Sequence, residues 1–427
     1  MKNSATPITE LLSFMVDNRG KTVPAAESGF PLIATNCIKH NSIYPTFENV
    51  RYVDEKTKDS WFRAHPEPND IIFVNKGTPG RVCLVPDPVP FCFAQDMIGF
   101  RCDPEKIDYQ YLFAVLRSDY IQKKIENYHV GLVIPHFKKG DLKHLNIPRL
   151  ENRDAELAAG KLYLALSEKI ELNNRINAEL EAMAKTLYDY WFVQFDFPDD
   201  SPQGQGKPYK TSGGKMVYNP TLKREIPEGW DDGTLEDLGQ IVGGSTPSTQ
   251  KPENFATDGI PWITPNDLSN NQGNKFISRG GQDVSVEGIK NASLKKYPAG
   301  TVLLSSRAPI GYMAISRNEV TTNQGFKSFV PNKGYSTEII YYTVKNSLKA
   351  ITQYASGSTF KEVSGGTLKT VKVVLPSVAM SDTFTEKVKP IFSQQDFIER
   401  ENAELVALRD WLLPMLMNGQ VIVGEAS

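Results

Sequence analysis

The sequence lacks any long apolar run and any recognisable N-terminal signal. No stretch of its 427 residues approaches the ~20 consecutive apolar residues that a helix needs to cross a bilayer. Residues 1–20 show no basic start, apolar core or cleavage site of a secretory signal. We therefore expect a soluble, cytoplasmic protein, long enough for two or three domains that each bury their own core.

Cysteine and histidine are scarce, and neither occurs at a metal-binding spacing. The four cysteines, Cys37, Cys83, Cys92 and Cys102, form no C-x-x-C pair, and the five histidines include no H-E-x-x-H pattern. Four reduced, mostly buried thiols are expected in a cytosolic protein. The sequence therefore predicts no metal site in this chain.

Catalytic motifs are also missing. Gly20, Lys21 and Thr22 resemble the end of a phosphate-binding P-loop, but Met15 stands where that motif needs its first glycine. Neither Pro86-Asp87 nor Pro198-Asp199 is followed at useful spacing by the acidic-x-Lys pair of a metal-dependent nuclease. The chain also contains no Asn/Asp-Pro-Pro-aromatic motif of an amino-methyltransferase and no G-x-S-x-G turn. We expect a protein that is not itself an enzyme, whose chemistry would come from partners.

An internal repeat is the strongest positive feature. The stretch NAELEAMAKTLYDYWF (177–192) restarts as NAELVALRDWLLPMLM (402–417), with apolar residues stepping by three and four. This spacing is typical of a coiled-coil seam and predicts two matching helices. The predicted seam residues are Ile176, Leu180, Met183, Leu187 and Tyr190 on the first helix, and Ile398, Leu405, Leu408 and Leu412 on the second.

The similarity continues upstream of both helices. The matching pairs of segments are 29–38 with 259–268, 70–85 with 300–315, and 137–150 with 360–378. Short β-branched runs such as IIFV and TVLLSS alternate with Gly/Pro turns, and one helical run interrupts each half, at 108–128 and at 336–355. The chain is one unit written twice, an α+β domain followed by a long helix.

This interpretation divides the chain into five parts. Residues 1–150 form the first domain, 151–197 the first helix, 198–226 a linker rich in Gly, Pro, Ser and Lys, 227–378 the second domain, and 379–420 the second helix. An aromatic cluster, YDYWFVQFDF, closes the first helix. It is typical of a core packed on the adjoining domain, and a partner-docking patch is the alternative.

Charge is distributed unevenly along the chain although the net charge is only −2. Residues 1–150 carry 19 basic and 17 acidic side chains, and residues 201–380 carry 20 and 14. The helical segments are acidic, with 5 basic and 11 acidic residues in 151–200 and 4 and 8 in 381–427. Positive domains favour a polyanion such as DNA, whereas acidic helices would separate the domains or receive a protein. Ordinary solvated helix faces are the alternative.

Polar and basic side chains occupy matching places in the two domains. Lys76 and Arg307 each stand between a strand and a Gly/Pro turn, where a cation can reach a phosphate or a guanine edge, although a surface ion pair would look the same. Amides can read adenine or merely close turns, and the Gly-rich loop 242–252 fits phosphates or a plain surface loop. The predicted DNA-contacting residues are Asn36, Lys39, Lys76, Thr78, Gln95, Lys138, Ser245, Thr246, Ser248, Asn266, Arg307, Gln324, Thr359 and Lys361.

Several phrases are distinctive in combination: GGSTPST, IPWITPNDL, SSRAPIG, NQGFKSF and NAELVALRDWLLPMLMNGQV. With the order domain, helix, domain, helix, they resemble the DNA-specificity subunit of type I restriction-modification enzymes over essentially the whole chain. The first domain departs most, with NKGTPG in place of SSRAPIG.

The resemblance implies that each domain is a target-recognition domain for one half of a bipartite DNA sequence, and that the two helices pack as an antiparallel coiled-coil spacer. It also implies partners: two methyltransferase subunits that use S-adenosylmethionine on adenine, and restriction/translocase subunits that use ATP and Mg. The assembled complex would be an adenine-specific DNA methyltransferase and an ATP-dependent endonuclease. A scaffold for protein ligands only, or a stand-alone DNA-modifying enzyme, are the rival hypotheses.

Overall fold

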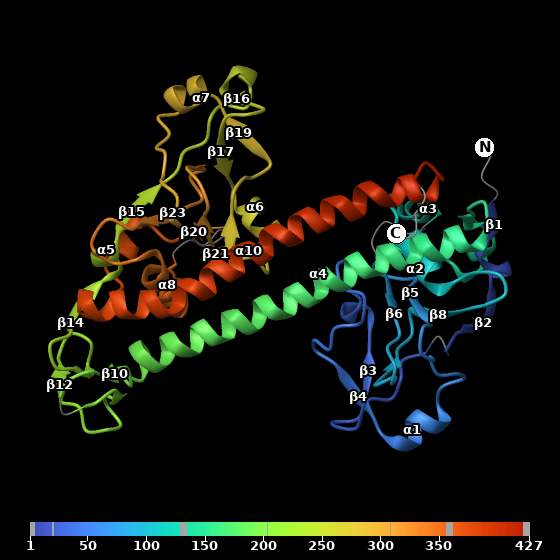
Figure 1. Cartoon of the computed structure of the whole chain (residues 1–427), viewed down its shortest axis with the longest axis horizontal. Coiled ribbons are helices and arrows are strands. Elements are labelled where there is room, and N and C mark those ends of the chain that lie inside the picture. The colour runs from blue at the N-terminus through green and yellow to red at the C-terminus, as the bar shows by residue number, and fades with distance from the viewer. Residues whose placement is uncertain are drawn as a thin grey trace, which may run out of the picture. The chain divides into compact units, whose positions relative to one another are not determined.

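The computed structural model describes residues 5–18, 21–128, 135–202, 204–307, 309–355 and 362–421. The chain forms two compact units, Met1–Arg175 with Glu401–Ser427, and Ile176–Arg400. Two long helices, α4 (Arg153–Tyr188) and α10 (Val378–Met417), each contribute one segment to either unit (Figure 1). Each unit therefore combines an α+β body with a piece of both helices.

The first unit contains two sheets and one strand pair. Its four-stranded antiparallel sheet has the order β2 (Leu12–Val16), β8 (Met97–Cys102), β5 (Ile71–Val74), β6 (Val82–Leu84). Its three-stranded sheet has the order β4 (Arg51–Val53), β3 (Phe30–Ile33), β7 (Cys92–Phe93), with β3 and β7 parallel. The strand pair and helices are β1 (Ala5–Pro7), β9 (Asn146–Pro148), η1 (Ile8–Glu10), η2 (Thr35–Cys37), α1 (Glu55–Ser60), α2 (Tyr109–Arg117), α3 (Asp119–Tyr128) and η3 (Lys139–His144).

The second unit has the larger set of strands. Its five-stranded sheet has the order β15 (Gln240–Gly243), β23 (Lys327–Val330), β20 (Val302–Ser306), β21 (Ile310–Ser316), β18 (Phe276–Ile277). Its four-stranded sheet has the order β16 (Phe255–Ala256), β19 (Gln282–Val284), β17 (Ile260–Ile263), β22 (Thr321–Thr322). The remaining elements are η4 (Asp189–Val193), β10 (Pro198–Asp199), β11 (Lys207–Pro208), β12 (Met216–Asn219), β13 (Arg224–Pro227), β14 (Asp231–Thr234), α5 (Leu235–Leu238), η5 (Pro252–Asn254), α6 (Pro265–Asn270), α7 (Val286–Asn291), α8 (Thr337–Gln353), α9 (Gly365–Leu368) and β24 (Lys372–Leu375).

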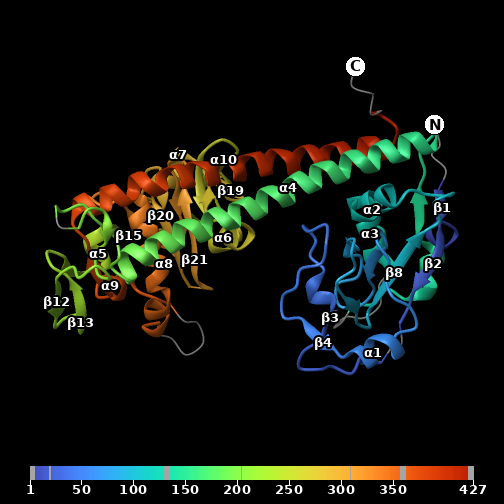
Figure 2. The same cartoon turned by 60° about the horizontal axis from the view of Figure 1, so that its bottom comes forward.

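The two bodies share one topology, which confirms the predicted duplication and mixed α+β class. The order β2-β8-β5-β6 returns as β15-β23-β20-β21, and β4-β3-β7 returns as β19-β17-β22 with the last pair again parallel. The predicted strands IIFV and TVLLSS are β5 and β20, and the predicted helical runs are α2 with α3, and α8. α8 packs on β20 and β21 (Figure 2).

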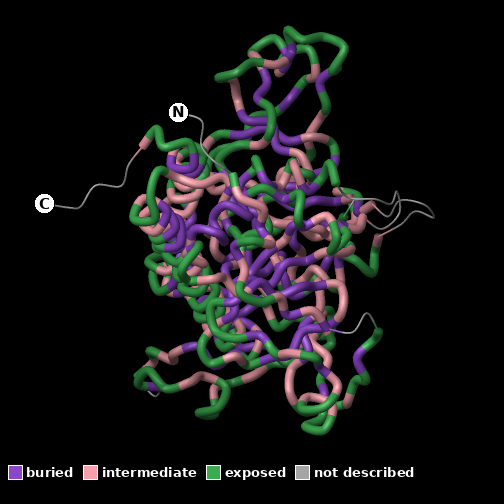
Figure 3. The backbone as a smooth tube through the Cα atoms, turned by 90° about the vertical axis from the view of Figure 1, so that its right-hand side faces the viewer, coloured by how far each residue is buried: buried purple, intermediate pink, exposed green. Residues whose placement is uncertain are grey.

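Local sequence explains where the helix of the second body begins and which face it buries. The side chain of Ser336 accepts a hydrogen bond from the amide of Ile339 and so caps α8. Ile340, Val344 and Ile351 recur near the helical period and are fully buried against the sheet. Buried residues gather in the interior, while the outlying loops are mostly exposed (Figure 3).

The buried stripe of the long helices differs from the predicted seam. Within the second unit α4 buries Asn177, Ala184 and Tyr188, and α10 buries Phe384 and Phe392. The side-chain amide of Gln395 on α10 donates to the carbonyl of Asn177 on α4 at 3.3 Å, and Tyr188 on α4 packs on Phe384 on α10. Because the residue numbers rise along α4 while those of the partners on α10 fall, the two segments run in opposite directions. Within the first unit the side-chain amide of Asn173 donates to the carboxylate of Glu401 at 2.6 Å and to the side-chain oxygen of Asn402 at 2.9 Å. The helices thus meet through polar as well as apolar side chains.

The seam prediction is therefore wrong at four positions, whose side chains are exposed by 40, 58, 37 and 43%: Ile176, Met183, Tyr190 and Leu408. Ile398 is buried, and the other four are partly buried, namely Leu180, Leu187, Leu405 and Leu412. The apolar pattern was misleading because several of the inward positions are occupied by asparagine, glutamine and glutamate, which hydrogen-bond to one another. A contact stripe predicted from hydrophobicity alone leaves out such polar positions, so it is assigned to the wrong face of the helix.

The aromatic cluster at the end of α4 belongs to the core, which confirms the first of its two interpretations. The side chains of Trp191, Phe192, Phe195 and Phe197 are buried, and Phe197 stacks on Trp230 with ring centroids 5.1 Å apart. Here the helix widens into the π-helical turn η4 before the chain leaves it. The predicted linker that follows contains two small hairpins, β10 with β11 and β12 with β13.

Candidate nucleic-acid interface

Lys76 and Arg307 occupy the same structural position in the two domains. Each follows the end of a central strand, β5 or β20, and forms an isolated antiparallel bridge with a segment that enters its domain from later in the sequence. The partner of Lys76 is His136, and the partner of Arg307 is Glu362. The sequence-based equivalence of the two cations is therefore confirmed in three dimensions.

Main-chain hydrogen bonds one residue earlier match as well. The amide of Asn75 donates to the carbonyl of Asp96 at 3.0 Å, and the amide of Ser306 donates to the carbonyl of Gly325 at 2.8 Å. Gln95 and Gln324 directly precede these two acceptors. Each domain thus brings the segment that carries its predicted amide, Gln95 or Gln324, alongside the end of its central strand.

The first domain has polar atoms at this place that its own described residues leave without hydrogen bonds. Thr78 Oγ1 and Gln95 Oε1 are buried and have no partner within that part of the chain. Lys76 Nζ lies 3.9 Å from a carboxylate oxygen of Asp96, with both side chains more than a third exposed. Lys138 is exposed at the start of η3. The exposed ammonium groups of Lys76 and Lys138 are available to phosphate or base-edge atoms, whereas the buried oxygens of Thr78 and Gln95 are not accessible in this conformation.

In the second domain a carboxylate lies among the cations. Glu362 is 3.9 Å from Arg307 Nη1 and 4.0 Å from Lys327 Nζ. Burial lowers the pKa of Lys327, the carboxylate of Glu362 opposes that shift, and nearby Arg307 adds to it. The hydroxyl of Thr246 donates to Gln324 Oε1, so the Gly-rich loop reaches the predicted amide. A weakly held, partly exposed arginine of this kind can exchange its carboxylate for a phosphate or a base.

The Gly-rich loop is anchored by its backbone, while hydroxyls remain at its surface. The amide of Ser245 donates to the carbonyl of Thr322 at 3.0 Å, and the indole of Trp262 donates to the carbonyl of Ser245 at 3.1 Å. Farther along, the side-chain amide of Asn254 donates to the carbonyl of Ser248 at 3.0 Å, and the side chain of Ser248 is exposed. The loop is therefore a fixed surface, suited to contact a ligand without rearrangement.

Gly244 is where this loop approaches the sheet most closely, and its replacement by alanine is expected to be costly. A Cβ there would lie 2.1 Å from the carbonyl oxygen of Thr322 and 2.2 Å from that of Asn323, so the backbone must shift. We expect Gly244→Ala to lower the free energy of unfolding by about 1–3 kcal/mol. Gly243→Ala is the matched control, because its nearest neighbour would be 3.7 Å away. Equal thermal melts for both variants would contradict the expectation.

Other predicted contacts are engaged within their own domain. The amide of Asn36 donates to the carbonyl of Glu48 at 2.8 Å, and Lys39 Nζ lies 3.0 Å from the Glu48 carboxylate. This arrangement matches the alternative that the amide closes a turn. Asn266, its counterpart in the second domain, is exposed on α6.

Sequence reasoning missed three side chains that the fold brings to these places: His136, Lys327 and Glu362. The signal was present for Glu362, because it follows a predicted lysine within the matched segment 360–378. Lys327 is preceded by a buried phenylalanine and looked like an ordinary strand residue. Two predicted contacts, Thr359 and Lys361, lie outside the described residues.

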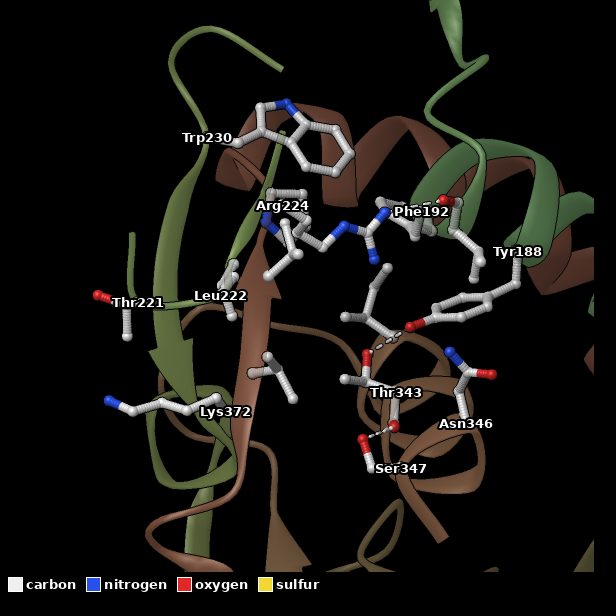
Figure 4. A pocket seen from close by; sticks show the side chains of 15 residues that line it. Tyr188, Phe192, Thr221, Leu222, Arg224, Trp230, Thr343, Asn346, Ser347 and Lys372 are labelled. Carbon is white, nitrogen blue, oxygen red and sulfur yellow. Dashed lines mark hydrogen bonds between the residues drawn. The ribbon is translucent and has the colours of Figure 1, made fainter. Parts of the chain in front are cut away.

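A separate cavity of about 320 Å³ lies beside the end of α4 (Figure 4). Tyr188, on its wall, donates a hydrogen bond to Thr343 at 3.0 Å, and Arg224 donates to the carbonyl of Val193 at 3.1 Å. Burial raises the pKa of the Tyr188 hydroxyl. The residues that line this cavity include no predicted DNA contact, so it is distinct from the candidate interface.

Within the described ranges, no group of three or more His, Cys, Asp or Glu side chains is arranged to hold a metal ion. Three of the four cysteines are buried and Cys102 is partly exposed, as predicted. The same ranges contain no helix whose length and hydropathy would let it cross a membrane.

Comparison with known proteins agrees with this duplicated, two-domain class of protein. The sequence profile described as the type I restriction modification DNA specificity domain matches residues 14–182 and again 227–406. The chain is 40% identical over 199 residues to the MjaIX specificity subunit of Methanocaldococcus jannaschii, an alignment that spans 45% of this chain and 44% of that protein. It is 30% identical over 322 residues to the HindI specificity subunit of Haemophilus influenzae, covering 65% and 69% of the two proteins.

A solved structure has the same fold. The S subunit of a type I restriction-modification system from M. genitalium aligns with 99% of this chain and 96% of its own, with a TM-score of 0.61 at 16% identity. Because the profile matches both halves of the chain, the protein belongs to the family of type I restriction-modification DNA specificity proteins.

Proposed function

We propose that this chain is the DNA-specificity subunit of a type I restriction-modification complex and has no catalytic activity of its own. Residues 1–150 and 227–378 would be target-recognition domains, each reading one half of a bipartite sequence. The observation that carries the proposal is the duplicated interface, in which Lys76 and Arg307 stand at equivalent strand ends of two similar domains. A DNA site in two parts requires two similar readers. The positive charge of both domains supports the same ligand.

Partners would supply the chemistry. Two methyltransferase subunits would bind S-adenosylmethionine and methylate adenine, and restriction/translocase subunits would use ATP and Mg to cleave. Exposed apolar side chains support docking of a partner on the helices: Met183 is 58% exposed on α4 and Phe397 60% exposed on α10. A protein that acts on cellular DNA with such partners would work in the cytoplasm.

The two helices would form an antiparallel coiled-coil spacer between the half-sites. Their lengths support this role, because α4 has 36 residues and α10 has 40. At about 1.5 Å per residue, each helix is roughly 54–60 Å long. The opposite directions of the paired segments within the second unit fit the same arrangement.

The proposal is tested by replacing the two equivalent cations. If Arg307 contacts a base edge, Arg307→Ala should remove about 1–3 kcal/mol of discrimination at one position of one half-site. If it contacts phosphate, affinity should fall evenly over all sequences and the salt slope should shrink by about one. Lys76→Ala should have the corresponding effect on the other half-site. Titrations of labelled duplexes at several salt concentrations, with the methyltransferase-bound protein, separate these results.

Lys215→Ala is the charge-matched control for these titrations. Lys215 is exposed and pairs with Glu228 at 2.6 Å in the hairpin beyond α4, so its loss should leave DNA binding unchanged. If neither Arg307→Ala nor Lys76→Ala changes affinity, discrimination or salt slope, these strand ends are not the DNA interface. If the unmodified complex binds no DNA, the scaffold hypothesis is favoured instead.

A further inference from the structure

Ile43 and Lys275 occupy equivalent places in the two domains. The carbonyl of Ile43 accepts a hydrogen bond from the amide of Leu84 in β6 at 2.7 Å, and the carbonyl of Lys275 accepts one from the amide of Ile315 in β21 at 2.8 Å. β6 and β21 are matching strands of the duplicated sheet. In each domain, the chain at this residue therefore lies alongside the matching strand, β6 or β21.

The amides of these two residues donate to a carboxylate on the helix that follows their own domain. The amide of Ile43 donates to Glu171 Oε2 on α4 at 3.0 Å. The amide of Lys275 donates to Glu399 Oε1 on α10 at 2.6 Å, and the amide of Phe276 donates to Glu399 Oε2 at 3.1 Å. Backbone N–H groups in such buried places require an acceptor. In both copies, one helix glutamate supplies it.

In the second unit Glu399 is also bound to a cation. Arg317 Nη2 lies 2.7 Å from Glu399 Oε2, and Arg317 Nε donates to Asp396 on the same helix. The side chain of Glu399 is only 2% exposed. A buried carboxylate is stable only when its oxygens are fully hydrogen-bonded, and here three donors from the domain satisfy them.

The side chain of Lys275 extends the connection to the other helix. Its Nζ lies 2.6 Å from Glu181 on α4 and 2.6 Å from the amide oxygen of Gln395 on α10. Burial lowers the pKa of Lys275 to about 8, although the nearby carboxylate of Glu181 acts in the opposite direction and raises it. The segments of α4 and α10 in this unit are thus both tied to one stretch of the second domain.

We infer that Glu171 and Glu399 are positioning residues, each of which fixes the orientation of a domain on the helix that follows it. Orientation determines the direction in which the strand end bearing Lys76 or Arg307 faces. Both copies use a glutamate on the following helix, but not at matching repeat positions, because the register that pairs Asn177 with Asn402 places Glu171 opposite Asp396. The first domain has the apolar Ile43 where the second has Lys275. Glu171 therefore acts on a neutral backbone amide, and Glu399 acts within a charged network.

The orientation itself can be measured without DNA, and so independently of the proposed function. Spin labels at Val286→Cys and Phe397→Cys, both exposed, report the distance between α7 and α10 in the second unit. The chain without introduced cysteines gives the labelling background. We expect one narrow distance distribution, broadened by Glu399→Ala and unchanged by Glu404→Ala, an exposed carboxylate on the same helix. An unchanged distribution in a folded Glu399→Ala protein would overturn the inference. If that variant does not fold, Glu399→Gln serves in its place with the same expectation.

The DNA arm rests on the proposed function and uses site selection over a library of gap lengths by the assembled complex. Glu399→Ala and Glu171→Ala should lower affinity at the native gap about tenfold and admit neighbouring gaps, with the base preferences of each half-site retained. Glu171→Gln should restore the native gap, because its amide oxygen can still accept from Ile43. Glu399→Gln should not, because a neutral amide no longer forms the ion pair with Arg317 Nη2 and Arg317 keeps only Asp396 on that helix. A single native gap in both alanine variants contradicts the positioning role. Failure of the unmodified complex to select a two-part site contradicts the proposed function instead.

Discussion

Phe384→Ala is expected to lower the free energy of unfolding by about 3–5 kcal/mol, because a fully buried aromatic side chain leaves a cavity that its neighbours cannot fill. Phe384 is 0% exposed on α10. Its ring lies 4.9 Å from that of Phe192, 5.7 Å from Trp191 and 6.0 Å from Tyr188, measured between centroids. The loss removes contacts between α10, the end of α4 and the π-helical turn. Chemical denaturation followed by circular dichroism measures it.

Phe397→Ala is the matched control, since it removes the same side chain from the same helix. Phe397 is 60% exposed, so its loss should change the free energy of unfolding by less than about 0.5 kcal/mol. Equal destabilisation by the two variants would mean that the aromatic cluster does not join the helices to the second domain.

Lengthening both helices is expected to change which DNA sites are bound. Seven residues inserted after Arg175 in α4 and after Arg400 in α10 add about 10.5 Å to each helix, which equals about three base pairs. Three base pairs also turn DNA by roughly 100°, so the second half-site would face away from its reader. We expect one heptad to abolish tight binding at every gap length. Three heptads add about 31.5 Å, close to one DNA turn, and should restore binding at a gap about ten base pairs longer.

Selection from a library of gap lengths tests this expectation for each insertion variant. The control places the same seven residues between Gly213 and Gly214, in the turn that follows β11, where the chain grows but neither helix does. That control protein should keep the native gap. If the preferred gap stays constant in the helix insertions too, the helices do not set the spacing. DNA bending, at a cost of a few kcal/mol, would reduce the difference in affinity between the one-heptad and three-heptad variants without removing it.

The duplication could be predicted from sequence because the two copies retain the same local signals. Strands IIFV and TVLLSS, the Gly/Pro turns after them and the helical runs at 108–128 and 336–355 each depend on neighbouring residues. The equivalence of Lys76 and Arg307 followed from the same alignment. The local sequence pattern predicts a strand, turn or helix reliably where the residues of that element determine its structure.

The helix interface could not be predicted in this way because polar side chains occupy part of it. Asn177 and Gln395 are buried. From the sequence alone, polar amide side chains are assigned to the surface, because burial requires a hydrogen-bonding partner that the sequence does not identify. Lys275 stands in the polar stretch NNQGNKFI, and no local signal separates it from surface lysines. Glu362 and His136 reach the candidate interface through bridges with residues far away in the sequence. Such contacts exist only after the chain has folded.

The polar side chains between the long helices also restrict how these helices can slide along each other. An all-leucine stripe offers nearly equal burial after a shift of one heptad, so its pairing is degenerate. Here, sliding would separate Asn173 from Glu401 and Asn402 in one unit, and Asn177 from Gln395 and Glu399 in the other. Each displaced amide would be buried without a partner, at about 1–3 kcal/mol apiece. Within each unit, these hydrogen bonds therefore favour one pairing of the two helix segments over a pairing shifted by one heptad.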